Sequence, residues 1–458
     1  MDETGTVAIP NNAGVAITAA NSNTIGGTAA GAGNLLSGNI NSGIVIESQR
    51  DTTLTVGTAA ANMILGNLIG TTAAGNAPLG NQNGIAINGG SGNTIGGAAA
   101  GARNVIFGFT GAGVSISSDP AIAGSSATGN VVQGNNIGTD VNNNGTSGTG
   151  KGVLMQRASG NTIGGVNPGE GNTIANKEVG VQVDGSTGSA VNNRILRNAI
   201  YNNSFLNIWL SNGGNNLQAA PALTGATSSG PNQITVTGSL GGAGVAPFRL
   251  EFFSTPTATS QGKTFLTAAS IPGGAFSVPV PVAPAGQFVT ATATDANGNT
   301  SQFSNAVVIT AGPPATVTPN PGTTPQSVIA GSAFTPLAVT VRDRNGNAVG
   351  ATASVTFTAP GSGPSGTFSN GGTTIQVRTD ANGMASASFT GNLVGGTYQV
   401  IASVPGATSA TFTLTNAPHR APPSRPGPSQ TGTVNTQPGP RPGSTLPGQP
   451  PAPVPTSR

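Results

Sequence analysis

The chain has 458 residues, of which 72 are glycine, 34 are proline and none is cysteine. Charged residues make up only 6% and the formal charge is +3, so the 16 basic residues are too sparse for the phosphate-neutralising stripe of a nucleic-acid-binding protein. No apolar run reaches the roughly 18 residues of a membrane-spanning helix, and without cysteine neither disulfides nor cysteine-based metal sites can form.

The first half of the sequence repeats with a period of about 69 residues. The string NTIGG occurs at Asn23–Gly27, Asn93–Gly97 and Asn161–Gly165. Between these strings recurs the theme Gly-[Val/Ile]-x-[Ile/Val/Met], followed by a polar gap and Asn-x-[Ile/Leu/Val]. The apolar alternation is too short for sandwich strands, and Asn and Gly mark corners with left-handed backbone angles. Short strands at a constant period predict the coils of a parallel β-helix.

We expect this β-helix to cover residues 1–213 in about nine rungs, with three copies of the theme in each long repeat. Equivalent Asn side chains in stacked rungs should form hydrogen-bonded ladders, and the inward Ile, Val and Leu should form the core. The terminal rung carries Tyr201, Phe205 and Trp209. These aromatics favour a seal over the end of the core, and the alternative is a sugar-stacking platform built on Tyr201 and Trp209.

Longer alternating strands follow the repeats. They predict one β-sandwich over residues 216–312 and a second over residues 315–416, because turn signals separate them every ten or so residues. The tail, residues 417–458, has 13 Pro in 42 residues and too few large apolar side chains for a core, so it should be an extended, disordered segment. The chain is therefore predicted to be all-β.

The loops Asp295–Asn299, Asp343–Asn347 and Asp380–Gly383 share the pattern Asp-x-Asn-Gly. This pattern resembles the start of a calcium loop, but an EF-hand also needs a Glu at its twelfth position, which none of the three has. Asp-x-Asn-Gly between two strands is itself a strong hairpin signal. We therefore interpret these loops as turns and expect no metal site.

The recurrent NTIGG and NxIxGNxIGT strings resemble those of right-handed parallel β-helix repeat proteins of the bacterial surface. The segment from LAVTVRDRNGNAVG to GGTYQVIASV, residues 337–404, resembles a group 1 bacterial immunoglobulin-like domain of the invasin and intimin type. The resemblance implies a non-enzymatic, exported, adhesion-type structural protein with a rigid β-helix stalk and Ig-like spacer domains. It implies an extracellular or cell-surface location, with glycans or cell-surface and matrix proteins as partners and without a cofactor. The start MDETGTVAIPNN has no signal-peptide pattern, so we expect the N-terminal part of the β-helix to be truncated.

The alternative function is a β-helix protein that binds or cleaves polysaccharides as a lyase or hydrolase. Such chemistry needs carboxylates on adjacent rungs. The best cluster in the sequence consists of Glu178 and Asp184, which flank one strand, with Arg157 near them. Glu47 shares its repeat phase with Asp184 but lies three rungs away in the predicted stacking. The single histidine, His419, lies in the tail, so no folded domain can use a histidine base.

Overall fold

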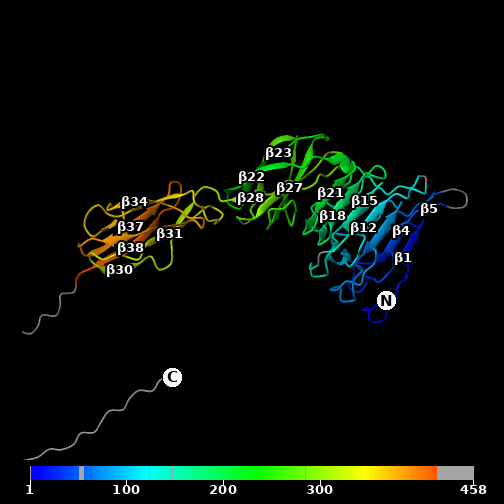
Figure 1. Cartoon of the computed structure of the whole chain (residues 1–458), viewed down its shortest axis with the longest axis horizontal. Helices are drawn as coiled ribbons and strands as arrows, with labels where there is room; N and C mark the ends of the chain where they lie inside the picture. Colours follow the sequence, from blue (N-terminus) through cyan, green and yellow to red (C-terminus); the bar gives the residue numbers. More distant parts are fainter. Residues whose placement is uncertain (1, 51–55, 123, 146–147, 284, 420–458) are drawn as a thin grey trace, which may run out of the picture.

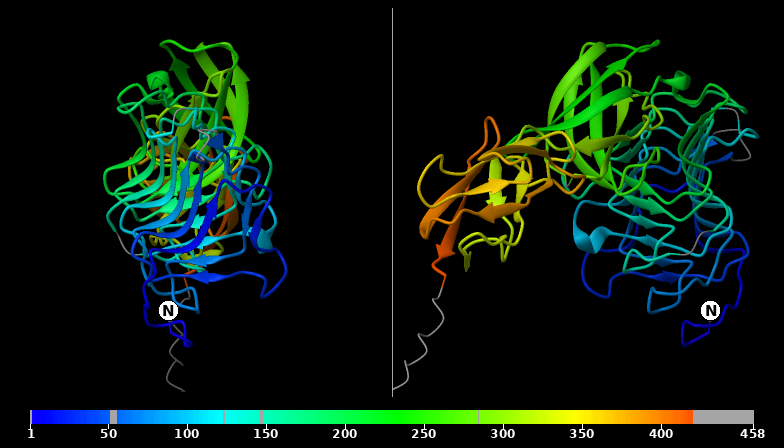
Figure 2. Two further views of the ribbon diagram at one scale, coloured as in Figure 1. Left: turned by 90° about the vertical axis from the view of Figure 1, so that its right-hand side faces the viewer. Right: turned by 60° about the vertical axis from the view of Figure 1, so that its left-hand side comes forward.

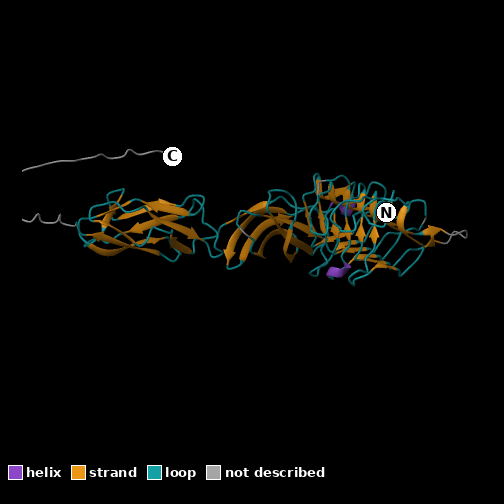
Figure 3. Cartoon of the chain, turned by 90° about the horizontal axis from the view of Figure 1, so that it is seen from below, coloured by secondary structure: helices purple, strands orange, loops and turns teal. Residues whose placement is uncertain are grey.

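The structure is a computed structural model that describes residues 2–50, 56–122, 124–145, 148–283 and 285–419. A β-helix, a first β-sandwich and a second β-sandwich follow one another along the long axis of the molecule (Figure 1). Almost all regular structure in the described ranges is strand; the exceptions are two short 3-10 turns, η1 (Ala100–Ala102) and η2 (Gly214–Leu217) (Figure 3). The all-β prediction is confirmed.

Three parallel sheets form the walls of the β-helix. Sheet A contains β1 (Ala13–Thr18), β4 (Ser42–Glu47), β9 (Asn83–Asn88), β12 (Ala112–Ser117), β15 (Lys151–Gln156), β18 (Val179–Asp184) and β21 (Leu206–Ser211). Sheet B contains β2 (Thr24–Gly26), β7 (Met63–Leu65), β10 (Thr94–Gly96), β13 (Val131–Gln133), β16 (Thr162–Gly164) and β19 (Arg194–Leu196). Sheet C contains β3 (Leu35–Leu36), β8 (Leu68–Ile69), β11 (Val105–Ile106), β14 (Asn136–Ile137), β17 (Thr173–Ala175) and β20 (Ala199–Tyr201). A small hairpin, β5 (Gln49–Arg50) and β6 (Val56–Gly57), extends from the wall.

The number of coils differs from the expected nine rungs, because sheet A has seven strands in the described residues. Ala13 pairs with Ser42, 29 residues further on, and Ser42 pairs with Asn83, 41 residues further on. One 70-residue repeat is therefore two coils of unequal length. NTIGG marks every second coil, since β2, β10 and β16 carry it whereas β7, β13 and β19 do not. The sequence theme overestimated the count because each coil contains three strands, and strands of different sheets were taken as separate coils.

The first glycine of each NTIGG string explains why the string is repeated so strictly. Gly26, Gly96 and Gly164 all have φ between +81° and +86°. A Cβ atom on any of them would collide with a backbone carbonyl oxygen of the next coil. Only glycine satisfies both the left-handed backbone and this close approach.

Two columns of asparagine run along the corners of the β-helix. The first Asn column joins Asn23, Asn62, Asn93, Asn130, Asn161, Asn193 and Asn215. The second Asn column joins Asn34, Asn67, Asn104, Asn135, Asn172 and Asn198. Along the second column each side-chain amide donates to the Oδ1 of the next Asn over 2.8–3.0 Å, and the backbone N–H of each Asn donates to the same oxygen. The expected ladders are confirmed.

The first sandwich packs its strands around a core that includes Leu250, Phe252 and Val289. Its hydrogen-bonded strand order is β25-β24-β27-β28-β22-β23-β26. The strands are β22 (Ala222–Gly230), β23 (Gln233–Leu240), β24 (Phe248–Thr255), β25 (Thr264–Ile271), β26 (Gly274–Pro281), β27 (Phe288–Thr294) and β28 (Val307–Thr310). All lie within residues 216–312, where the sequence predicts a sandwich.

The second sandwich has a three-stranded, a five-stranded and a two-stranded sheet around its own core. The first comprises β29 (Thr316–Pro319), β31 (Leu337–Arg342) and β35 (Met384–Ala387). The second comprises β30 (Gln326–Ile329), β38 (Ala410–Ala417), β37 (Gly396–Ser403), β32 (Ser354–Thr358) and β34 (Thr374–Arg378), and the third β33 (Gly366–Phe368) and β36 (Phe389–Gly391). β38 includes Ala417, the first residue of the predicted tail; the tail beyond residue 419 lies outside the described residues.

The first sandwich closes one end of the β-helix (Figure 2). Phe253 and Phe303 of the sandwich belong to the same buried cluster as the β-helix core. Their rings contact each other edge-to-face, with centroids 5.4 Å apart. The expected seal of Tyr201, Phe205 and Trp209 is wrong, since none of the three belongs to that core. Trp209 sits on the outer face of β21, because the alternate residues of that strand, Ile208 and Leu210, are the ones that point inward.

Candidate functional site

The structure does not bring the predicted catalytic residues together. Glu178 is exposed and directly precedes β18, whereas Asp184 is the last residue of that strand and is buried. Six residues of extended strand separate their backbones by roughly 20 Å. Arg157 follows β15 and donates from its Nε to the backbone carbonyl of Thr187. Neither pair of acids needed for glycoside cleavage, about 5 Å or 6.5–9.5 Å apart, is formed by these two carboxylates.

Asp184 is a structural acceptor in a polar column on sheet A. Its carboxylate accepts hydrogen bonds from Gln156 Nε2 at 2.9 Å and Asn212 Nδ2 at 2.8 Å, and from the backbone N–H and hydroxyl of Ser186 at 3.0 and 2.8 Å. Burial opposes ionisation, but these donors outweigh it and hold the pKa of Asp184 far below its ordinary value. Its neighbours in adjacent coils are Gln156 and Ser211, so no second acid lies next to it in the column.

The two proposed ligand-stacking residues lie on different walls of the β-helix. Tyr201 ends β20 in sheet C, and the ammonium of Lys263 lies 5.3 Å from its ring centroid. Burial raises the pKa of Tyr201. Trp209 lies in sheet A and packs edge-to-face on Phe205, with ring centroids 5.3 Å apart. Because sheets A and C are separate walls, the two rings do not form one platform.

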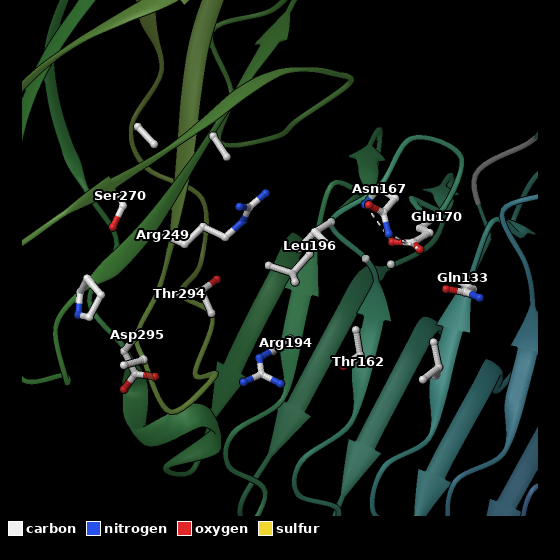
Figure 4. A pocket seen from close by; sticks show the side chains of 18 residues that line it. Gln133, Thr162, Asn167, Glu170, Arg194, Leu196, Arg249, Ser270, Thr294 and Asp295 are labelled. Atoms are coloured by element: carbon white, nitrogen blue, oxygen red, sulfur yellow. Dashed lines mark hydrogen bonds between the residues drawn. The ribbon is translucent and has the colours of Figure 1, made fainter.

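The most developed cavity of the molecule lies between sheet B and the first sandwich, and the sequence did not predict it. This junction cleft has a volume of about 710 Å³. From the β-helix it is lined by Gln133, Thr162, Glu170, Arg194 and Leu196, among others, and from the sandwich by Arg249, Ser270, Thr294 and Asp295 (Figure 4). It exists only because the sandwich sits across the end of the β-helix.

A buried carboxylate beside the junction cleft holds two arginines in place. Glu251 is fully buried in β24 and accepts hydrogen bonds from the backbone N–H of Arg197 at 2.7 Å and from Arg249 Nε at 2.9 Å. Arg249 Nη2 lies 2.9 Å from the same carboxylate. Burial raises the pKa of Glu251, although both arginines counteract the shift. The guanidinium of Arg197 stacks on Phe265, 4.0 Å from the ring centroid.

A signal for this site was present in the sequence. In β24, Arg249, Glu251 and Phe253 alternate with Phe248, Leu250 and Phe252. The second set packs in the sandwich core, so the first set forms the opposite face. Two charges two residues apart in an otherwise apolar strand indicate a polar contact on a face that another element covers.

Lys177 is a buried cation without a carboxylate partner among the described residues. Its side chain is 5% exposed. Nζ donates to the carbonyl oxygen of Phe109 at 3.2 Å and lies 4.2 Å from the centroid of the Phe109 ring. Burial lowers its pKa to about 8. The proton is therefore held more weakly in the folded state than in the unfolded state.

This shift predicts that the β-helix gains stability at alkaline pH. Between pH 8 and 10.5 the unfolded chain binds more protons at Lys177 than the folded chain, so the free energy of unfolding rises with pH, by up to about 3 kcal/mol. Urea unfolding of the wild type and of Lys177→Met across this range isolates the effect, because all other titrating groups are shared. The difference between the two proteins should change steadily with pH; a constant difference would contradict the assignment.

Comparisons with known proteins identify no family for this chain. No family model and no curated protein matches it. An adhesin of Escherichia coli matches 44% of this chain with 64% of its own length, at 15% identity and a TM-score of 0.27. A two-domain fibronectin type III segment of chicken tenascin matches 43% of this chain with 99% of its own, at 16% identity and a TM-score of 0.22. A β-glycosidase from Bacteroides vulgatus matches 43% of this chain with 25% of its own, at 15% identity and a TM-score of 0.19.

Likenesses this remote carry no argument about function, and the chain spans only a quarter of the glycosidase. The resemblance of the second sandwich to invasin-type domains stays a prediction. Within the described ranges, no group of three or more His, Cys, Asp or Glu side chains is placed to hold a metal ion. The described helical segments include none that is long and apolar enough to cross a membrane.

Proposed function

We propose that this protein is a non-enzymatic, exported surface protein of the adhesion type, in which a β-helix stalk and two sandwich spacers form one stiff rod. The carrying observation is the junction between the β-helix and the first sandwich, where a shared apolar core and a row of hydrogen bonds join the two parts. A catalytic role finds less support, since Glu178 and Asp184 are separated and Asp184 is fully engaged in hydrogen bonds.

The sandwich takes the place of a further coil. The last coil of a parallel β-helix leaves backbone N–H groups without the partners that another coil would supply. Here Asn299 Oδ1 accepts from Asn192 N–H at 2.7 Å, and Thr300 Oγ1 accepts from Ile195 N–H at 2.9 Å. Ile200 and Gly262 exchange two backbone hydrogen bonds, of 2.7 and 2.9 Å. Terminal caps of this kind complete a solenoid and fix its direction relative to the capping domain.

The second junction uses one of the Asp-x-Asn-Gly loops. Asp343 Oδ1 accepts the backbone N–H groups of Asn345 and Asn347, both at 2.9 Å, as expected for a turn. Asn345 then reaches into the first sandwich, where its Oδ1 accepts from Asn232 N–H and its Nδ2 donates to Ser228 Oγ, both at 2.6 Å. The loop therefore acts as a clasp between the two sandwiches, which favours a spacer that keeps its length.

We expect Asn345→Ala to loosen the two sandwiches without unfolding either. Asn382 occupies the equivalent place in the loop after Asp380, where its backbone N–H is bonded to Asp380, and Asn382→Ala is the matched control. Small-angle scattering of the whole chain should show a narrow set of elongated shapes for the wild type and Asn382→Ala. The set should broaden for Asn345→Ala. A compact, globular scattering profile for the wild type would contradict the rod.

Catalysis and location are tested separately. The whole chain is incubated with acidic and neutral polysaccharides and assayed for new reducing ends and unsaturated products; we expect none. Cleavage that disappears in Asp184→Asn would overturn the non-enzymatic role. An antibody against residues 315–416 should label intact producing cells. Labelling only after lysis would contradict surface display.

A further inference from the structure

The hydrogen-bonding groups of the junction cleft are unequally engaged. Formally the lining charges balance, because Arg194 and Arg249 are matched by Glu170 and Asp295. The carboxylates, however, are already bonded within the protein. Asn167 donates to Glu170 from its backbone and its side chain at 2.8 and 2.9 Å, and these bonds lower the pKa of Glu170. Asn299 donates to both oxygens of Asp295.

The cations still have free donors. The exposed guanidinium of Arg194 forms no hydrogen bond or ion pair with the part of the chain that the structure describes. Arg249 uses Nε and Nη2 on Glu251, which leaves Nη1 directed elsewhere, and its side chain is 35% exposed. Figure 4 shows the two guanidiniums projecting from opposite sides into the space between the sandwich and the β-helix. Guanidinium groups with free N–H donors bind carboxylates in paired, charge-assisted hydrogen bonds.

The rest of the cleft offers neutral polar groups on small apolar walls. The side chains of Gln133, Thr162 and Ser270 form no hydrogen bond among the described residues. The strands β13 and β16 are interior strands of sheet B, paired on both sides. They therefore present side chains rather than the free backbone edge that an extended peptide uses. Free amide and hydroxyl groups beside free guanidiniums suit a ligand that carries both hydroxyls and a carboxylate.

We propose that the junction cleft binds the carboxylate-bearing sugar units of an acidic polysaccharide, with Arg194 and Arg249 on the carboxylate and Gln133, Thr162 and Ser270 on the hydroxyls. This goes beyond the structural role and does not depend on the stiffness of the rod. No aromatic ring lines the cleft, so binding rests on charge-assisted hydrogen bonds rather than on stacking. The affinity should therefore fall as the salt concentration rises.

The experiment uses the whole chain and two probes, oligogalacturonate and hyaluronan oligosaccharide, in isothermal titration calorimetry. Fully methyl-esterified oligogalacturonate is the ligand control, because it keeps the sugar and removes the charge. Arg194→Ala should weaken binding by about 10-fold or more, the effect of losing a hydrogen bond to a charged group. Ser270→Trp should block the cleft while leaving both arginines in place. Arg378→Ala removes an exposed cation of the second sandwich and should leave binding unchanged.

Three outcomes would overturn the proposal. One is failure of the wild type to bind either acidic sugar. Another is binding that Arg194→Ala and Ser270→Trp leave unaltered, or that Arg378→Ala weakens equally. The last is equal binding of the methyl ester, or tighter binding of polyglutamate than of both sugars, which would assign the cleft to neutral glycans or to acidic peptides. Scattering profiles of the variants establish that each keeps the shape of the wild type, so a loss of binding reports on the cleft.

Discussion

Replacing Asn135 with alanine should destabilise the β-helix by roughly 3–5 kcal/mol. Asn135 lies in the middle of the second Asn column and is 1% exposed. Its Oδ1 accepts both the backbone and side-chain N–H of Asn104, and its Nδ2 donates to Asn172 and to the carbonyl of Ile95. Alanine would leave several of these buried groups without partners, and each such group costs about 1–3 kcal/mol.

Asn34→Ala is the matched control for Asn135→Ala. Asn34 begins the same column but is exposed, and its amide makes one such bond, to Asn67 Oδ1 at 3.0 Å. Its removal should cost less than about 1.5 kcal/mol. Urea unfolding can be followed by the fluorescence of Trp209, the only tryptophan in the chain, which lies in the β-helix. Equal losses for the two variants would show that the ladder does not stabilise the fold.

The sequence predicts the β-helix well because its determinants are local and repeated. An Asn at a corner, an inward Ile and a left-handed Gly recur at fixed offsets, and each coil needs only its neighbours. The coil count was harder to predict, because the three strands of one coil resemble one another more than the alternate coils do. β22 was missed for a different reason: its segment ALTGATSSG is mostly polar and contributes only small side chains and Leu223 to the core.

The candidate site could not be predicted in the same way, because it joins residues from two domains. Arg194 and Arg249 are 55 positions apart in the sequence and meet only when the sandwich caps the β-helix. The phase argument did exclude an acid beside Asp184, and the structure places Gln156 and Ser211 there. It placed Glu178 near Asp184 because they flank one strand, but an extended strand keeps its two ends apart.

The cap itself yields the second large effect, because Phe253 is the side chain through which the sandwich enters the β-helix core. Phe253 is 2% exposed and packs edge-to-face on Phe303 and on Phe265, with ring centroids 5.4 and 5.7 Å apart. Phe253→Ala should cost about 3–5 kcal/mol, through lost burial and the cavity left behind. The loss should appear first in the last coil, as faster amide hydrogen exchange at Ile195 and Ile200, whose N–H groups bond to the sandwich.

Phe252→Ala separates the loss of the cap from the loss of a large aromatic. Phe252 precedes Phe253 in β24 and is fully buried, but it points into the sandwich core and contacts Phe276 there. Its removal should destabilise the sandwich by a similar amount and leave exchange in the middle of the β-helix unchanged. If only Phe253→Ala accelerates exchange at Ile195 and Ile200 under native conditions, the sandwich acts as the terminal cap of the solenoid. If both variants accelerate it equally, the two parts unfold as one unit and the cap has no separate role.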